Sequence, residues 1–94
     1  MMEIKHKKGD KNGYFYYEKD GNELAQMAYV WAGADKLIID HTEVDDSLKG
    51  QGIGKKLLAQ LVDFVRAEKI KVIPLCPFAN ATLQKTKEWQ DVMA

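Results

Sequence analysis

Cysteine is nearly absent from this sequence, proline is rare, and neither sign of charge predominates. One cysteine among 94 residues cannot form an internal disulfide, which favours a reducing compartment and predicts a cytoplasmic protein. Lys and Arg together number 14, and so do Asp and Glu, so the composition gives no reason to expect a nucleic-acid partner. The basic run Lys5-His6-Lys7-Lys8 is typical of a solvated strand or tail.

Long apolar runs and metal-ligand clusters are missing as well. No apolar stretch approaches the roughly 20 residues that cross a bilayer, and Met1-Met2-Glu3 followed by lysines lacks the apolar core of a signal peptide. The two histidines and one cysteine show no metal-ligand spacing. We therefore expect neither a membrane nor a metal. The 46% hydrophobic and 30% charged residues describe a single folded domain over residues 1–94.

Turn residues divide the first half of the chain into short strands. Residues 14–18 predict one strand, Asp20-Gly21-Asn22 predicts a hairpin turn, and residues 23–31 predict a second strand, with a helix as the alternative. After a turn, residues 36–44 predict a strand that begins apolar and ends polar. Alternation along it places Asp40, Thr42 and Val44 on one face and Ile39, His41 and Glu43 on the other.

A helix and a parallel strand are predicted in the second half. Apolar residues recur at spacings of three and four from Ile53 to Val65, which predicts an amphipathic helix from Gly54 to about Glu68. Residues 70–75 form a β-branched run that a right-handed crossover would place parallel to residues 36–44. Residues 80–87 predict a short last helix. The order predicts an α+β (mixed α/β) fold, with antiparallel strands followed by a β-α-β unit.

Three glycines stand close together between the polar strand and the helix, in Lys49-Gly50-Gln51-Gly52-Ile53-Gly54-Lys55-Lys56. Glycine lets a backbone approach a ligand closely, and a helix beginning here would point unpaired N–H groups at a phosphate. A tight strand-to-helix turn with solubilising lysines is the alternative. A P-loop is excluded because Lys56 replaces the required hydroxyl residue. A dinucleotide fingerprint, Gly-x-Gly-x-x-Gly, is excluded because Gly50, Gly52 and Gly54 are evenly spaced.

The run Lys49-Gly50-Gln51-Gly52-Ile53-Gly54 resembles the Arg/Gln-x-x-Gly-x-Gly/Ala motif of the GNAT acetyltransferase superfamily. Residues 39–44 and the segment Pro74-Leu75-Cys76-Pro77-Phe78-Ala79, in this order around the loop, are similar to the very small GNAT-like acetyltransferases. The resemblance extends over residues 15–83 and implies a minimal GNAT-like fold. Lys49 departs from the motif, since it offers a point charge in place of the bidentate fork of arginine.

The resemblance implies acetyl-CoA as cosubstrate. In the superfamily, backbone N–H groups of the glycine loop bind the pyrophosphate, and the preceding strand binds the pantetheine arm through its main chain. The cofactor-binding residues that it implies here are Val44, Lys49, Gly50, Gln51, Gly52, Ile53, Gly54, Lys55 and Asn80. For Asn80 the alternative, which we favour, is a cap on the last helix.

Three residues are candidates for the chemistry. Cys76 alone would be interpreted as a small buried hydrophobe, but the resemblance places it near the acyl group, where it either accepts the acetyl or lines the pocket. His41 and Glu43 are the candidate general bases, because an incoming ammonium must lose a proton. The alternative for this pair is a hydrogen-bonded polar pair at the sheet edge.

We therefore predict an acetyl-CoA-dependent N-acetyltransferase that acts on an amine, either a small molecule or a protein, as a monomer or weak dimer. Acceptor-binding elements of larger superfamily members do not fit within this chain, so the resemblance does not imply a substrate class. A non-catalytic CoA-binding or interaction module is the alternative. A nucleic-acid binder using the lysine-rich N-terminus and aromatic strands is the third and weakest hypothesis, because the charges balance.

Overall fold

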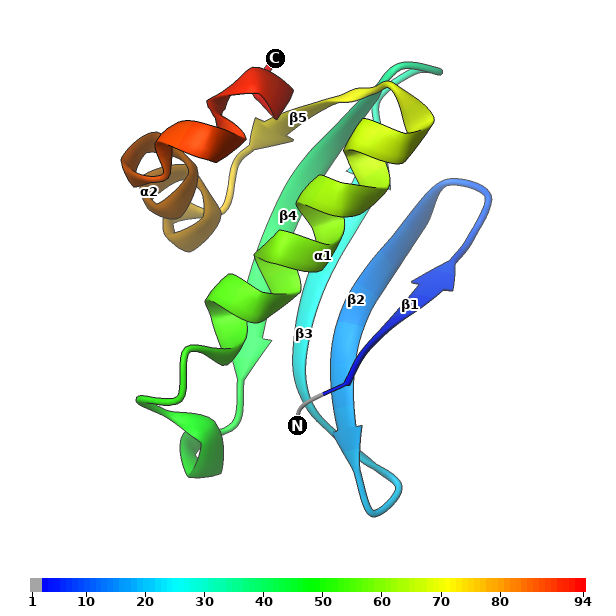
Figure 1. The fold of residues 1–94 in the computed structure, drawn as a ribbon. Coiled ribbons are helices and arrows are strands. Elements are labelled where there is room, and N and C mark those ends of the chain that lie inside the picture. Colours follow the sequence, from blue (N-terminus) through cyan, green and yellow to red (C-terminus); the bar gives the residue numbers. More distant parts are fainter. Residues whose placement is uncertain (1–2) are drawn as a thin grey trace.

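The computed structural model describes residues 3–94; Met1 and Met2, on which part of the signal-peptide expectation rests, lie outside the described residues. The strands form one five-stranded sheet in sequence order (Figure 1). They are β1 (Ile4–Lys8), β2 (Asn12–Lys19), β3 (Asn22–Trp31), β4 (Lys36–Val44) and β5 (Lys71–Pro74). The helices are α1 (Ile53–Glu68), α2 (Pro77–Lys85) and the short 3-10 turns η1 (Asp46–Leu48) and η2 (Lys87–Val92).

The pairing of the strands confirms the predicted α+β class. β1 to β4 pair antiparallel, whereas β5 pairs parallel with β4 after the crossover through α1. The predicted hairpin between β2 and β3 is present, with positive φ at Asp20 (53°) and Gly21 (81°) as a type I′ turn requires. Residues 23–31 are therefore a strand and not the alternative helix.

A bulge in β4 corrects the predicted alternation. Ala28 pairs with His41 and the next residue of β3, Tyr29, pairs with Ile39, so Asp40 is an extra residue without an opposite partner. Side chains beyond the bulge therefore change faces relative to strict alternation. Thr42 shares a face with Ile39, and not with Asp40 as predicted. The grouping of Ile39 with His41 and Glu43 was wrong.

One face of the sheet is covered by α1, which crosses it diagonally in Figure 1. The apolar stripe of α1 is fully buried there, as predicted, and packs on inward-facing strand residues into one core. The fully buried members of the stripe are Leu57, Leu58, Leu61, Val62 and Val65, and the strands add Met27, Tyr29, Leu37, Ile39 and Val72. Beneath the helix these side chains supply the apolar burial that stabilises the fold.

The opposite face, called the open face below, carries side chains that lie outside this core. Strand register and burial assign to it Lys5, Lys7, Tyr14, Tyr16, Gln26, Ala28, Val30, Ile38, His41, Glu43 and Ile73. The aromatic residues of β2 are thus divided between the faces: Phe15 is buried, whereas Tyr14 and Tyr16 are half-buried, with ring centroids 5.2 Å apart.

The basic run near the N-terminus is an edge strand that contributes to both faces. His6 points under α1, stacks on Phe15 with ring centroids 3.9 Å apart, and lies 2.6 Å from the Tyr29 hydroxyl through its Nε2. Burial, and then the charge of Lys8, hold the pKa of His6 below its ordinary value. Lys5 and Lys7 are left on the open face.

Element ends differ from the prediction mainly near the C-terminus. α1 begins at Ile53, one residue before the predicted start, and ends at Glu68 as predicted. β5 ends at Pro74. α2 covers Pro77–Lys85 instead of residues 80–87, because Pro77 stands at the first helical position, where its missing N–H costs nothing.

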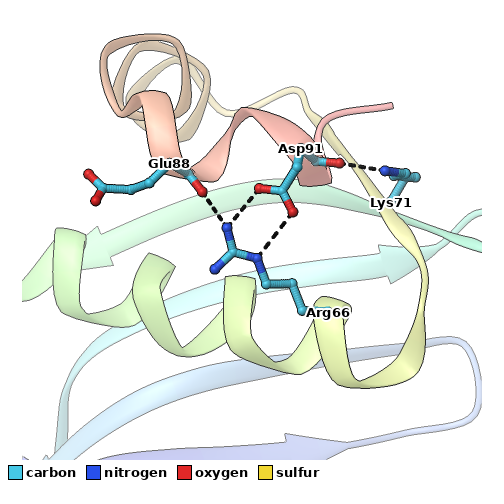
Figure 2. Close-up of polar contacts among 4 residues, drawn as sticks. All are labelled: Arg66, Lys71, Glu88 and Asp91. Carbon is cyan, nitrogen blue, oxygen red and sulfur yellow. Dashed lines mark hydrogen bonds and ion pairs between the residues drawn. The ribbon is translucent and has the colours of Figure 1, made fainter.

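A cluster of polar contacts fixes the C-terminal segment to α1 and β5 (Figure 2). Arg66 binds both carboxylate oxygens of Asp91, at 2.7 and 3.2 Å, and also donates to the Glu88 carbonyl. Lys71 donates to the Asp91 carbonyl, and the Ala94 amide donates to the Val72 carbonyl at 2.8 Å. The last residues therefore lie along the outer side of β5. Within residues 3–94, no helix combines the length and apolar character that a membrane crossing needs.

Candidate functional site

The glycine loop follows directly from the end of β4. Asp45 caps η1 by accepting hydrogen bonds from the Ser47 hydroxyl at 2.6 Å and the Ser47 amide at 3.0 Å. Both bonds hold the pKa of Asp45 below its ordinary value, and the bond from the hydroxyl has the larger effect. The chain then reaches Gly52, whose carbonyl accepts from the Lys56 amide at 3.2 Å to start α1.

The N-terminus of α1 has no capping side chain. Its N-cap residue is Gly52, in the left-handed region at φ 70°, and its first turn carries no acidic residue. The first N–H groups of any α-helix have no partner within the helix. Lys49 and Lys55 flank this end, which is therefore suited to an anion.

The three glycines of the loop have different physical roles. Gly50 and Gly52 have φ values of 81° and 70°, and nothing lies within 4 Å of where their Cβ atoms would be. They are required for backbone conformation. At Gly54 a Cβ would lie only 2.7 Å from Cζ of Phe78. This glycine lets the Phe78 ring pack on the first turn of α1.

A cavity of about 390 Å³ lies between the loop and the second half of β4. Among the residues implied by the resemblance, Val44, Lys49, Gly50, Gly52, Ile53, Gly54 and Lys55 line it. Gln51 and Asn80 are not among its lining residues. Gln51 instead donates through its side chain to the Ser47 carbonyl, at 3.4 Å.

The expected cap role of Asn80 is wrong. α2 begins before this residue, and the position before its first turn is Cys76, which makes no side-chain capping bond. Asn80 lies inside the helix, where its amide donates to the Cys76 carbonyl at 2.9 Å and its Oδ1 accepts from Gln84 at 2.9 Å.

Thr42, Leu48 and Phe78 also line the cavity, although the sequence reasoning did not select them. For Thr42 a signal existed, since alternation put it on the face of Val44. Phe78 lies in the Pro-Leu-Cys-Pro-Phe segment, but its contact with Gly54 joins positions far apart in the chain. Leu48 is a buried apolar residue of η1 without a distinguishing pattern.

The cavity lies beside the part of β4 that extends beyond β5. Their pairing ends at Ile39 and Pro74, and the amides of Leu75 and Cys76 both donate to the Ile39 carbonyl at 3.1 Å. Beyond that point β4 continues to Val44 paired only with β3. Backbone groups on one side of the strand at Thr42–Val44 therefore face the cavity without a β5 partner.

Cys76 lies behind the cavity wall. It is 6% exposed, and its Sγ is 3.4 Å from Oγ1 of the cavity-lining Thr42. Burial raises the pKa of the Cys76 thiol, but hydrogen bonds from Thr42 and from the backbone N–H groups of Ala79 and Phe78 outweigh it, so that the pKa lies below its ordinary value. The thiol is thus polarised and only one side chain away from the cavity.

His41 and Glu43 do not meet Cys76 in the cavity. They project from the open face of β4, His41 with Nε2 3.8 Å from Glu43 Oε1 and with Nδ1 3.5 Å from Asp40 Oδ2. All three side chains are exposed. The sheet therefore separates the candidate bases from Cys76. No group of three or more metal-ligating side chains is present in the described part of the chain, and the absence of a metal stays a prediction.

A fold of this kind defines a class. Antiparallel strands lead to a strand that splits from its parallel neighbour, and a glycine-rich helix start lies beside the split. The family model of the GCN5-related N-acetyltransferases matches residues 13–92. The chain belongs to this family.

Relatives of known structure agree with this assignment. A GCN5-like protein from Staphylococcus aureus is 38% identical to this chain. The match covers 96% of this chain and 87% of that protein, with a TM-score of 0.75. A GNAT family acetyltransferase from Elizabethkingia anophelis with acetyl-CoA bound is 13% identical to this chain. That match covers 80% of this chain and 52% of that protein, with a TM-score of 0.63. The second likeness shows the fold alone.

Protein NATD1 from Xenopus tropicalis is a relative by sequence. It is 34% identical over 55 residues, which make up 58% of this chain and 50% of that protein. The match to NATD1 from Homo sapiens is also 34% over 55 residues, and covers 58% and 49%. The chain thus spans about half the length of the curated relatives it matches.

Proposed function

We propose that this chain binds acetyl-CoA in the cavity beside β4 and transfers the acetyl group to a primary amine. The observation that carries this proposal is the uncapped, glycine-rich start of α1 at the point where β5 leaves β4. A helix end of this kind attracts a pyrophosphate, and Lys49 and Lys55 add positive charge. Membership of the family and the relative with acetyl-CoA bound support the choice of ligand.

The cavity also suits the pantetheine arm. Its volume of about 390 Å³ lies in the range of small-molecule sites. An amide-containing arm laid along this part of β4 would hydrogen-bond the Val44 backbone groups that β5 leaves free, while the Thr42 amide is already bonded to the Cys76 thiol. Thr42 is farther from the loop than Val44, so the thioester would lie near Thr42 and the Cys76 thiol behind it.

Two routes of transfer fit these residues. In the direct route the amine nitrogen attacks the thioester carbonyl, the C–N bond forms as the C–S bond breaks, CoA leaves as its thiolate, and His41 or Glu43 removes the amine proton. Because both bases lie on the open face, the amine would approach from that face, past the end of β5. In the second route the Cys76 thiolate first attacks the thioester carbonyl and CoA leaves as its thiolate. The amine then attacks the acetyl-cysteine, the C–N bond forms as the C–S bond breaks, and the Cys76 thiolate is restored as it or a base takes the amine proton.

Titration of isotope-labelled protein with acetyl-CoA tests the binding step. We expect the largest amide shifts from Gly52 to Lys56, with smaller shifts at Thr42 and Val44, and none along β1. The variant Lys7→Gln, on the open face away from the cavity, serves as a matched control and should bind normally. Absence of loop shifts at millimolar ligand would refute the proposal.

Three variants separate the routes. If the cysteine route operates, mass spectrometry after incubation with acetyl-CoA shows one acetyl group on Cys76, and Cys76→Ala abolishes transfer. If transfer is direct, Cys76→Ala keeps most of its rate, while His41→Gln or Glu43→Gln lowers it about 10²-fold or more. Acetyl-CoA binding without transfer to any of a panel of amines would identify a non-catalytic CoA-binding module.

A further inference from the structure

The open face is organised in rows that run across the strands. One row consists of Lys5, Tyr16, Gln26 and Glu43, and the next of Lys7, Tyr14, Ala28 and His41. A third row is mainly apolar, with Val30, Ile38 and Ile73. Both polar rows begin with a lysine on the edge strand β1 and end with an imidazole or carboxylate on β4. In these two rows the face thus carries two lysines at one side, the Glu43 carboxylate and the His41 imidazole at the other, and two tyrosines, Gln26 and Ala28 between them.

We propose that the open face binds a second copy of this chain, about a two-fold axis that runs parallel to the strands between β2 and β3. This rotation places β1 of each copy over β4 of the other and β2 over β3. Lys5 then faces Glu43, and the bulky Tyr14 faces the small Ala28. An isologous contact of this kind makes every pairing twice. Aligned strands are one of the two arrangements that packed sheets adopt.

The charges select this axis over the alternative. A two-fold axis perpendicular to the strands would place β1 over β1, so that Lys5 and Lys7 of one copy faced the same lysines of the other. Like charges held face to face oppose association. Lys5 also reaches Glu18 of its own chain at 3.4 Å, but that pair is solvent-exposed, so the lysine remains available. Lys7 has no ion pair within residues 3–94.

The size of the face sets the strength of the dimer. The four strands that overlap about this axis, at their length and spacing, offer about 500 Å² a copy, against about 800 Å² a partner in a standard stable complex. We therefore expect a weak dimer, formed at hundreds of micromolar and dissociated at low micromolar concentration. The inference does not rest on acetyl-CoA binding, because the cavity lies on the other face of the sheet. The dimer would cover His41 and Glu43, so the direct route of transfer would belong to the monomer.

Sedimentation velocity at protein concentrations between about 5 µM and 1 mM tests the proposal. NMR spectra over the same range show which amide signals shift as the concentration rises. A dimer should form at high concentration, with concentration-dependent shifts at Tyr14, Ala28 and Val30. Lys5→Glu and Glu43→Lys should each weaken the dimer about tenfold or more, and the double variant should restore it. Val30 is 38% exposed in the monomer, so Val30→Glu places a charge in the proposed interface and should abolish the dimer. Urea unfolding verifies that this variant is folded.

Each contrary result overturns a stated part of the proposal. A protein that stays monomeric at 1 mM leaves the open face free for an external acceptor and rejects the dimer. A dimer whose shifts map elsewhere, or that Val30→Glu does not affect, rejects this surface. A double charge variant that remains as weak as the single variants rejects the axis parallel to the strands. Acetyl-CoA affinity should be equal in wild type and Val30→Glu.

Discussion

The two ends of α1 differ in how their backbone groups are satisfied. At the C-terminal end, Lys69 donates its amide to Arg66 and Val65 carbonyls, Ile70 donates to Val65, and Arg66 joins the helix to Asp91. At the N-terminal end no side chain caps the helix and no acidic residue offsets its dipole. One end is thus completed within the fold, whereas the other has no side-chain cap. The helix therefore gains its stability elsewhere than at its N-terminal end.

The largest expected effect on stability comes from a substitution in the middle of α1, between the two ends compared above. Leu61 is fully buried, so Leu61→Ala should lower the free energy of unfolding by about 3 kcal/mol through lost burial and a cavity. The control Val30→Ala, on the open face, should cost less than about 1 kcal/mol. Urea unfolding measures both, and equal losses would contradict the assignment of the core to one face.

A change at the open N-terminal end should separate stability from ligand binding. Lys55→Glu should lower acetyl-CoA affinity about 30-fold, roughly 2 kcal/mol, because a carboxylate would replace a cation beside the phosphates. Its stability should change by less than about 0.5 kcal/mol, since the gain at the helix N-terminus offsets the loss of the Lys55 contact with the Trp89 ring.

Lys56→Glu is the matched control for that change. Lys56 is also in the first turns of α1 but does not line the cavity, so its replacement should weaken acetyl-CoA binding no more than about threefold. Calorimetric titration gives the affinities and urea unfolding the stabilities. Similar losses of affinity in the two variants would show that only overall charge matters.

A change at the completed C-terminal end should affect stability alone. Lys69 has a φ of 58°, a conformation that glycine adopts without steric cost. Lys69→Gly should therefore raise the free energy of unfolding by about 0.5–1 kcal/mol and leave acetyl-CoA affinity unchanged. Glu68→Gly, one residue earlier and still helical, should lower it by about 1 kcal/mol. If Lys69→Gly and Glu68→Gly both lowered the free energy of unfolding, Lys69 would not be a left-handed cap of α1.

The smallest effect concerns pH at the ion pair of the C-terminal end. The hydrogen bonds from Arg66 hold the pKa of Asp91 below its ordinary value. The folded pKa is therefore lower than the unfolded one, so the pair adds stability above the ordinary aspartate pKa and loses it as pH falls through the folded pKa. Arg66→Gln should raise the pKa of Asp91 towards its ordinary value in an NMR titration. High salt should do the same in wild type, since both partners are exposed.

The sequence predicted those parts of the fold that local patterns determine. The hairpin at Asp20-Gly21, the amphipathic stripe of α1 and its end at Glu68 each follow from a few neighbouring residues. The loop that lines the cavity was found for the same reason, since its glycines stand together. Local patterns therefore sufficed for the architecture and for the loop that lines the cavity, whereas cofactor binding there stays a prediction.

Features that depend on contacts between distant residues could not be predicted in this way. The bulge at Asp40 exists because β3 pairs with both halves of β4, and nothing in residues 36–44 alone marks it. The contact of Phe78 with Gly54 and the position of Cys76 behind Thr42 arise only after β5 and α2 are packed. The roles of Cys76, His41 and Glu43 stay predictions for the same reason.

The bulge in β4 has an evolutionary consequence. Asp40 is exposed, so substitutions there should be tolerated, and the bulge lets β4 carry this extra residue without changing the faces of the residues that follow. In a relative lacking this one residue, Ile39 and His41 would be neighbours and would still pair with Tyr29 and Ala28, so His41 and Glu43 would stay on the open face. Descendants of this chain can therefore change or lose residue 40, whereas loss of a residue from the regular part of β4 would turn every later side chain of the strand to the other face.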